Sequence, residues 1–204
     1  MWKTFFKRVT ASLIDLCFPA FCLSCKESLE GEGLCGACAK DLQLIDVKAR
    51  CPYCFEEKGE RECLKEHPLY SASCCIGLGP AAAMARAVDA SDPLRQKNIG
   101  SLLVVQLCLL GWPVPDLLLP FPPKDPIPLG VAKQMRFFLP VEVRDCLRKS
   151  LFTSSYAASI EENLSDKNCL IVSLQKVAQE EKQVLFHCLQ LADPKRVFFL
   201  SFLE

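Results

Sequence analysis

An excess of charge of either sign is missing from this sequence: 24 lysines and arginines balance 24 aspartates and glutamates over 204 residues. The neutral balance removes the strong overall field that often marks nucleic-acid or membrane-surface binding. Long apolar runs are missing too, because the longest candidate, residues 99–110, has only the length of one buried helix. We therefore expect no transmembrane segment.

The amino end lacks a clean export signal, because Lys7, Arg8 and Asp15 interrupt the apolar stretch of residues 1–21. We therefore expect a cytoplasmic protein whose cysteines stay reduced. The chain also has no Walker loop, dinucleotide-binding fingerprint or nucleophile elbow. None of the enzyme classes recognised by those motifs is indicated.

Cysteine, in contrast, is abundant, and two Cys-x-x-Cys pairs, Cys22/Cys25 and Cys35/Cys38, stand nine residues apart. Two thiolates that flank two residues can hold one face of a tetrahedral Zn²⁺, and a second pair completes the coordination sphere. These residues predict a closed four-thiolate site. Four protein ligands leave no position for water or substrate, so the predicted zinc is structural.

A second zinc site, with three thiolates and one imidazole, is predicted from Cys51, Cys54, Cys63 and His67. The chain would then hold two zinc ions. Disulfides and a thioredoxin-like redox pair are the alternatives, but three Cys-x-x-Cys pairs within about 35 residues favour metal. The remaining cysteines are expected to be small buried core residues; they are Cys17, Cys74, Cys75, Cys108, Cys146, Cys169 and Cys188.

The apolar pattern divides the chain into three parts. Residues 1–18 have apolar side chains at helical spacing, which predicts an amphipathic N-terminal helix. Residues 19–68 are the expected double zinc ribbon, where metal must supply the folding free energy. Residues 69–204 alternate between apolar strands and helices, which predicts an α/β domain with a mainly parallel sheet and flanking helices.

Within the α/β part, strands are expected at residues 73–78, 116–121, 169–174 and 197–203. Helices are expected at residues 81–90, 98–110 and 178–191, and Gly111 should end the second of them. The prolines between Pro120 and Pro128 predict a loop.

Several short motifs are shared with one known family. They are Leu13-Ile-Asp-Leu-Cys-Phe-Pro19, Cys22-Leu-Ser-Cys25, Leu34-Cys-Gly-Ala-Cys38, Cys51-Pro-Tyr-Cys54, Asp116-Leu-Leu-Leu-Pro-Phe-Pro122, Asn168-Cys-Leu-Ile-Val172 and Lys195-Arg-Val-Phe-Phe-Leu200. On these motifs the chain resembles the ComF family, in which a double zinc ribbon is fused to a phosphoribosyltransferase-like domain. The likeness is strong over residues 13–54 and weaker, but in the same order, beyond them.

The resemblance also shows what this chain has lost. In the family, the strand at residues 168–172 leads into two aspartates that hold ribose hydroxyls and then a Thr-Thr-Gly-Ala-Thr phosphate loop. Here Ser173 and Leu174 stand in place of the aspartates, and Val177-Ala-Gln-Glu-Glu181 stands in place of the loop. The glutamates would repel a phosphate. A family lysine is missing from residues 87–91 and an Arg-Gly-Phe-Asn-Gln element from residues 129–135, so we expect no phosphoribosyl transfer.

The family is associated with natural competence, the uptake and handling of incoming DNA. The resemblance therefore implies a non-catalytic accessory protein with single-stranded DNA or DNA-handling proteins as partners and no small-molecule substrate. A phosphoribosyltransferase with an altered pocket and a scaffold that binds another protein through its ribbons are the alternatives. For DNA, Tyr53 or Phe55 could stack on a base beside basic residues of the zinc region such as Arg50.

Overall fold

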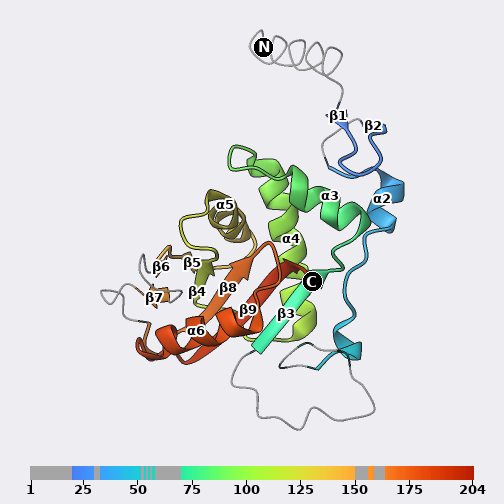
Figure 1. Cartoon of the computed structure of the whole chain (residues 1–204). Helices are drawn as coiled ribbons and strands as arrows, with labels where there is room; N and C mark the ends of the chain where they lie inside the picture. Colours follow the sequence, from blue (N-terminus) through green and yellow to red (C-terminus); the bar gives the residue numbers. More distant parts are fainter. Residues whose placement is uncertain are drawn as a thin grey trace.

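A five-stranded, entirely parallel β-sheet is the centre of the fold in this computed structural model (Figure 1). The structure describes residues 20–29, 33–51, 53, 55, 57, 70–149, 156–158 and 164–204. Across the sheet, the strands are β3 (Tyr70–Cys75), β9 (Arg196–Leu203), β8 (Asn168–Ser173), β4 (Leu117–Pro120) and β5 (Glu142–Val143). The predicted α/β class with a parallel sheet is thus confirmed, and the helix predicted for residues 1–18 lies outside the described residues.

The three central strands are apolar along almost their whole length. Every residue of β4 is buried, and only the first residue of β8 and of β9 is not. A continuous apolar strand is typical of a parallel sheet that is covered on both faces. The sequence pattern therefore located these three strands to within one residue at each end.

Helices cover both faces of the sheet. On one face, α3 (Gly79–Ala87), α4 (Pro93–Leu110) and α5 (Pro126–Met135) share a core with Phe198, Leu200 and Phe202 of β9. On the other face, α6 (Gln179–Gln190) packs on Val197 and Phe199. Successive β9 side chains thus enter opposite cores, because side chains alternate across a strand.

One helix begins earlier than the apolar pattern predicts, a second was not predicted at all, and both start at an Asp-Pro pair. The Asp92 carboxylate accepts the N–H groups of Leu94 (3.1 Å) and Arg95 (3.0 Å), so α4 starts at Pro93. The prediction of a loop up to Pro128 was wrong, because α5 already starts at Pro126. Asp125 caps it by accepting the Ile127 N–H (2.9 Å), and proline in a first turn loses no helical hydrogen bond.

The first strand and helix of the α/β part also differ from the prediction. β3 ends at Cys75, and α3 then spans Gly79–Ala87 instead of residues 81–90. The Arg95 guanidinium donates to the Ala87 carbonyl (2.8 Å), which satisfies an acceptor at the end of the helix. Gly111 ends α4 as predicted, with a left-handed φ of 64°.

The expectation of buried cysteines holds for Cys74, Cys75, Cys146 and Cys169. It was wrong for Cys108, which is exposed on α4, while Cys188 is half-buried. Cys17 lies outside the described residues. Among those described, no helix combines the length and the apolar character that crossing a membrane requires.

Smaller elements lie before the first strand of the sheet and between two of its strands in the chain. A short antiparallel pair, β1 (Ala20–Phe21) and β2 (Ser28–Leu29), is followed by α2 (Gly36–Lys40) and the 3-10 turn η1 (Val47–Ala49). A second antiparallel pair, β6 (Leu147–Lys149) and β7 (Tyr156–Ala158), lies between β5 and β8 in the chain.

Residues 44–45 pair with the end of β3, although their sequence belongs to the expected zinc region. The Ile45 N–H donates to the Cys74 carbonyl (2.9 Å), and the Gln106 amide donates to the carbonyls of Ile45 (3.2 Å) and Ser73 (3.0 Å). Ile45 and Phe55 are buried in the same core as α4. Part of the expected zinc region is therefore held by the hydrophobic core, which the sequence analysis did not predict.

Close packing between α4 and α5 depends on Gly100. A Cβ atom at this position would lie 3.3 Å from both the Val131 carbonyl oxygen and the Met135 Cγ. We expect Gly100→Val to destabilise the protein by about 1–3 kcal/mol, because the added atoms would force the helices apart. Urea unfolding would measure the effect. Lys97→Val, at an exposed position of α4, is the control for helix propensity, and equal losses in both variants would contradict the packing argument.

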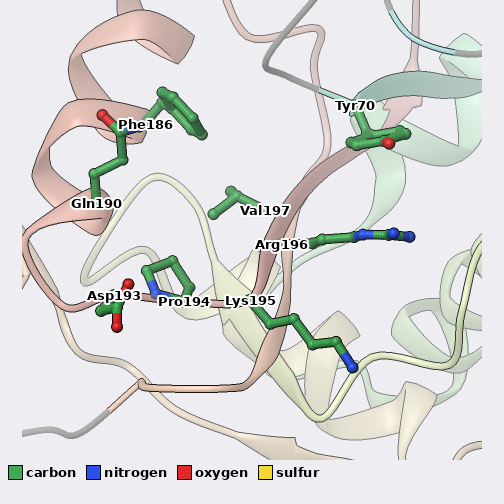
Figure 2. Close-up of a pocket in the computed structure, with 8 residues that line it drawn as sticks. All are labelled: Tyr70, Phe186, Gln190, Asp193, Pro194, Lys195, Arg196 and Val197. Atoms are coloured by element: carbon green, nitrogen blue, oxygen red, sulfur yellow. The ribbon is translucent and has the colours of Figure 1, made fainter.

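The amino-terminal end of the sheet is uneven. β9 begins at Arg196, whereas β3 begins opposite Phe198, so no described residue of β3 lies beside Arg196 and Val197. A hollow of about 320 Å³ opens beside Arg196 and Val197, between Tyr70 and the end of α6 (Figure 2).

Candidate functional site

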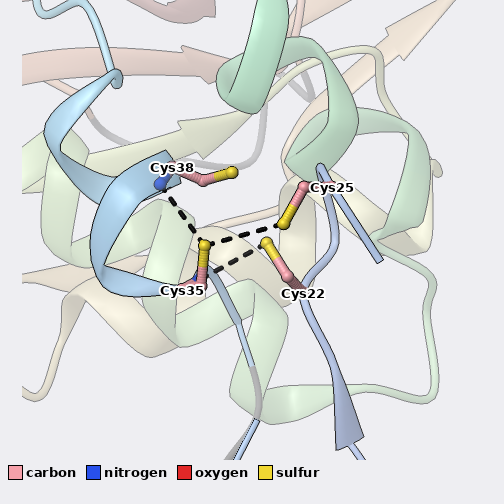
Figure 3. A group of neighbouring side chains, drawn as sticks. All are labelled: Cys22, Cys25, Cys35 and Cys38. Carbon is pink, nitrogen blue, oxygen red and sulfur yellow. Dashed lines mark hydrogen bonds between the residues drawn. The ribbon is translucent and has the colours of Figure 1, made fainter. Parts of the chain in front are cut away.

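The sulfur atoms of four cysteines lie close together at the start of α2. Cys22 follows β1, Cys25 lies in the turn before β2, Cys35 is the N-cap of α2, and Cys38 lies inside that helix. All four sulfurs lie within 4.8 Å of one another, and those of Cys25 and Cys35 are 3.6 Å apart. Figure 3 shows the four side chains grouped together. Zn–S bonds of about 2.3 Å in a tetrahedron separate the sulfurs by about 3.8 Å. The cluster therefore has the size of one metal centre.

The local backbone builds this cluster by turning N–H groups toward sulfur. The Cys35 N–H points at the Cys22 sulfur (3.3 Å), and the Cys38 N–H points at the Cys35 sulfur (3.4 Å). The turn after Cys22 is closed by the Lys26 N–H, which donates to the Cys22 carbonyl (3.0 Å) with Lys26 at φ 65°. Such donors stabilise thiolates, which are the form that binds metal.

The pKa values of the Cys22, Cys25 and Cys38 thiols are shifted in different directions. Burial raises the pKa of Cys22, but backbone N–H donors, that of Cys35 first, outweigh it and bring the pKa down to about 6. For Cys25, the Glu27 backbone lowers the pKa, but contacts with the neighbouring sulfurs and desolvation raise it to about 12. Desolvation is also the main cause that raises the pKa of Cys38. A metal ion bound here would displace protons from the other thiols.

The donor set fits a metal ion and is consistent with zinc. Three of the four cysteines are buried and only Cys25 is exposed, so the sulfurs face one another and not the solvent. Four thiolates complete a tetrahedral sphere without water. Such a centre would stabilise the fold of residues 20–40 and would not bind a substrate.

The second predicted zinc site is described only in part. Cys51 is buried, with 6% of its surface exposed. Cys54, Cys63 and His67 lie outside the described residues, so this site stays a prediction.

Metal analysis of the purified protein tests that second site. We expect close to two zinc ions per chain, which should fall to one in Cys51→Ser, because a site that loses one of four ligands binds zinc far more weakly. The α/β core should stay folded by circular dichroism. One zinc ion per chain in the unchanged protein would reduce the metal ligands to Cys22, Cys25, Cys35 and Cys38.

The carboxyl-terminal edge of the sheet is where ligands bind in open α/β folds. The connections reverse direction between β4 and β8, since β4 leads outward to β5 and β8 leads the other way to β9. The loop between β8 and α6 lies at this point. Glu180 and Glu181 stand in the first turn of α6, and the Ala178 N-cap makes no side-chain hydrogen bond. Negative charge at a helix start competes with a bound anion.

Two cations close to the carboxyl-terminal end of β9, Arg50 and Lys176, contact Glu204. Arg50 binds the Glu204 carboxylate with two hydrogen bonds (2.9 and 3.1 Å), and the Lys176 ammonium lies 3.7 Å from the same carboxylate. Sequence reasoning missed this cluster, because 154 residues separate Arg50 from Glu204. Their charges are therefore not free to bind a phosphate.

The aromatic residues proposed for base stacking have different environments. Phe55 is only 4% exposed and lies under the Arg50 guanidinium (5.8 Å), so the expectation that it stacks on a base was wrong. Tyr53 is 44% exposed, and its ring lies 5.4 Å from that of Tyr70. Of the two, only Tyr53 is accessible.

The hollow at the amino-terminal edge was not foreseen. Lys195 and Arg196 line it, and the signal available in the sequence was two adjacent cations directly before an apolar strand. Comparison with known proteins adds no further constraint: no protein-family profile matches the chain, and no curated protein is significantly similar to it.

Proposed function

We propose that this protein is a zinc-binding, ComF-like accessory protein of DNA uptake or a related DNA transaction, and that it works in the cytoplasm without catalysis. On this proposal, residues 19–68 are a double zinc ribbon, and residues 69–204 are a phosphoribosyltransferase-like domain that has lost its pocket. The observation that carries the zinc-binding part is the cluster of Cys22, Cys25, Cys35 and Cys38, and the one that supports the absence of catalysis is the pair of carboxylates, Glu180 and Glu181, in the first turn of α6.

Electrostatics at the carboxyl-terminal edge supports the proposal that the protein works without catalysis. A phosphoribosyl donor needs cations and free N–H groups around its phosphates. At this edge, Glu180 and Glu181 oppose an anion, while Arg50 is paired with Glu204 and Glu57, and Lys176 lies 3.7 Å from the Glu204 carboxylate. Like charges at contact distance in a partly dry site cost several kcal/mol, so donor binding is disfavoured.

The DNA part of the proposal rests on the resemblance to ComF proteins and on the exposed ring of Tyr53. Single-stranded DNA is the expected form, because an exposed aromatic ring can stack only on a base that is not inside a duplex. The zinc centre serves this function indirectly, by holding the N-terminal module in one conformation.

Two titrations of the zinc-loaded full chain test this function. Calorimetry with phosphoribosyl pyrophosphate and Mg²⁺ should give no heat of binding, whereas fluorescence anisotropy should detect binding of a labelled single-stranded 12-mer. The double variant Glu180→Gln/Glu181→Gln should gain weak donor affinity if the carboxylates are the obstacle. Binding or turnover of the donor by the unchanged protein would contradict the proposal, as would the absence of any binding to single-stranded DNA.

A further inference from the structure

The hollow at the amino-terminal edge of the sheet is a second candidate site, far along the strands from the switch point. It lies where β9 extends beyond the described residues of β3, and the turn from α6 to β9 closes one side (Figure 2). Its volume of about 320 Å³ lies at the lower end of the range found for small-molecule sites, about 300–1,000 Å³. It has room for one small ligand.

Two cations line one side of the hollow. Lys195 and Arg196 are both exposed, and neither side chain forms an ion pair or hydrogen bond with any residue that the structure describes. Figure 2 shows both side chains extending away from Asp193, which lies near Gln190 on the other side. Unlike Arg50 and Lys176, these two charges are available to an anionic group.

An aromatic strip borders the cationic side. The Tyr70 ring lies 5.4 Å from Tyr53, 5.0 Å from Phe198 and 6.3 Å from Trp112. Phe198 is 1% exposed, so the strip is anchored in the core at one end and open to solvent at Tyr53. A ring held in this way can stack on a planar ligand with little loss of side-chain entropy.

These features together select a class of ligand. Inorganic phosphate would use the cations but would gain nothing from Tyr70 and would be opposed by Asp193. A planar heterocycle with a phosphate uses all of them, because its ring can stack, its N–H groups can donate to Asp193 or Gln190, and its phosphate can bind the two cations. We propose that the hollow binds one nucleotide unit, either free or within a single strand. This inference rests on the proposed DNA function and adds the place where the strand is held.

A charge-reversal variant tests the site in the zinc-loaded full chain. Lys195→Glu/Arg196→Glu should weaken binding of a labelled deoxycytidylate 12-mer by about tenfold or more and should lower the salt dependence by about 0.7 per lost phosphate contact. The control is Lys133→Glu/Arg136→Glu, which makes the same change in net charge at exposed positions of α5 and the following turn. The affinity of this control for the 12-mer should stay within about twofold of that of the unchanged protein. If net charge alone set the affinity, both variants would lose it equally.

Free deoxycytidine monophosphate and the Tyr53→Ala variant distinguish the two sources of the nucleotide. A single strand that runs from the hollow onto Tyr53 should bind about fivefold or more weakly to Tyr53→Ala, while the free nucleotide should bind it unchanged. Unchanged folding is checked by circular dichroism and zinc content.

The outcomes separate this site from the wider function. Equal affinity of the two charge-reversal variants for the 12-mer would contradict the nucleotide site in the hollow. It would mean that DNA binds elsewhere on the protein. Binding of the free nucleotide without the 12-mer would support the hollow and contradict the DNA function. Binding of neither ligand by the unchanged protein would overturn both.

Discussion

Replacing Cys22 with serine is expected to remove one zinc ion per chain and to unfold the module around residues 20–40. Cys22 is fully buried, and its sulfur accepts the Cys35 N–H (3.3 Å), so no other group can take its place. A structural zinc ion contributes about 10–16 kcal/mol of apparent binding free energy in small modules. Elemental analysis would measure the zinc, and hydrogen exchange would show loss of protection in this segment alone.

The matched control for that experiment is Cys108→Ser. Cys108 is exposed on α4 and lies outside the cysteine cluster, so the same substitution there should leave the zinc content unchanged. A Cys22→Ser protein that keeps its full zinc content would contradict the metal centre. So would mass spectrometry that finds these cysteines joined as disulfides in protein purified under reducing conditions.

Phe198→Ala is expected to destabilise the α/β core by about 3–5 kcal/mol, which is a large part of the stability of a domain of this size. Phe198 lies on the second strand of the sheet, is 1% exposed, and packs 5.0 Å from the rings of both Tyr70 and Trp112. Truncation would leave a cavity between α4 and the sheet. Denaturant unfolding monitored by circular dichroism would measure the lost free energy.

Phe137→Ala is the control for that truncation. It removes the same atoms from a side chain that is 74% exposed in the turn after α5, so it should change the free energy of unfolding by less than about 0.5 kcal/mol. If both variants lost a similar free energy of unfolding, burial of the Phe198 ring would not explain the loss.

Local patterns were sufficient for much of the fold. The strands β4, β8 and β9 are continuous apolar runs, and no alternative structure buries them so completely. The helix starts at Pro93 and Pro126 were also present as Asp-Pro pairs, but the apolar pattern placed the first start at residue 98, and reading proline as a loop signal hid the second. Proline at the first helical position favours a helix instead of ending it.

The cysteine cluster could be predicted for the same reason. Cys22, Cys25, Cys35 and Cys38 lie within 17 residues, so one short loop and one helical turn bring their sulfurs together. The ligands predicted at Cys54, Cys63 and His67 lie outside the described residues and await the metal analysis.

By itself, the sequence determined the α/β class, the apolar strands and the cysteine cluster, because each is set by spacing over a few residues. Tertiary structure alone decided that Arg50 meets Glu204, that Phe55 is buried, and that β9 extends past β3 beside Tyr70. These features depend on strand register and on contacts between distant segments. Such pairings are chosen by the packing of the whole core, and no local pattern encodes them.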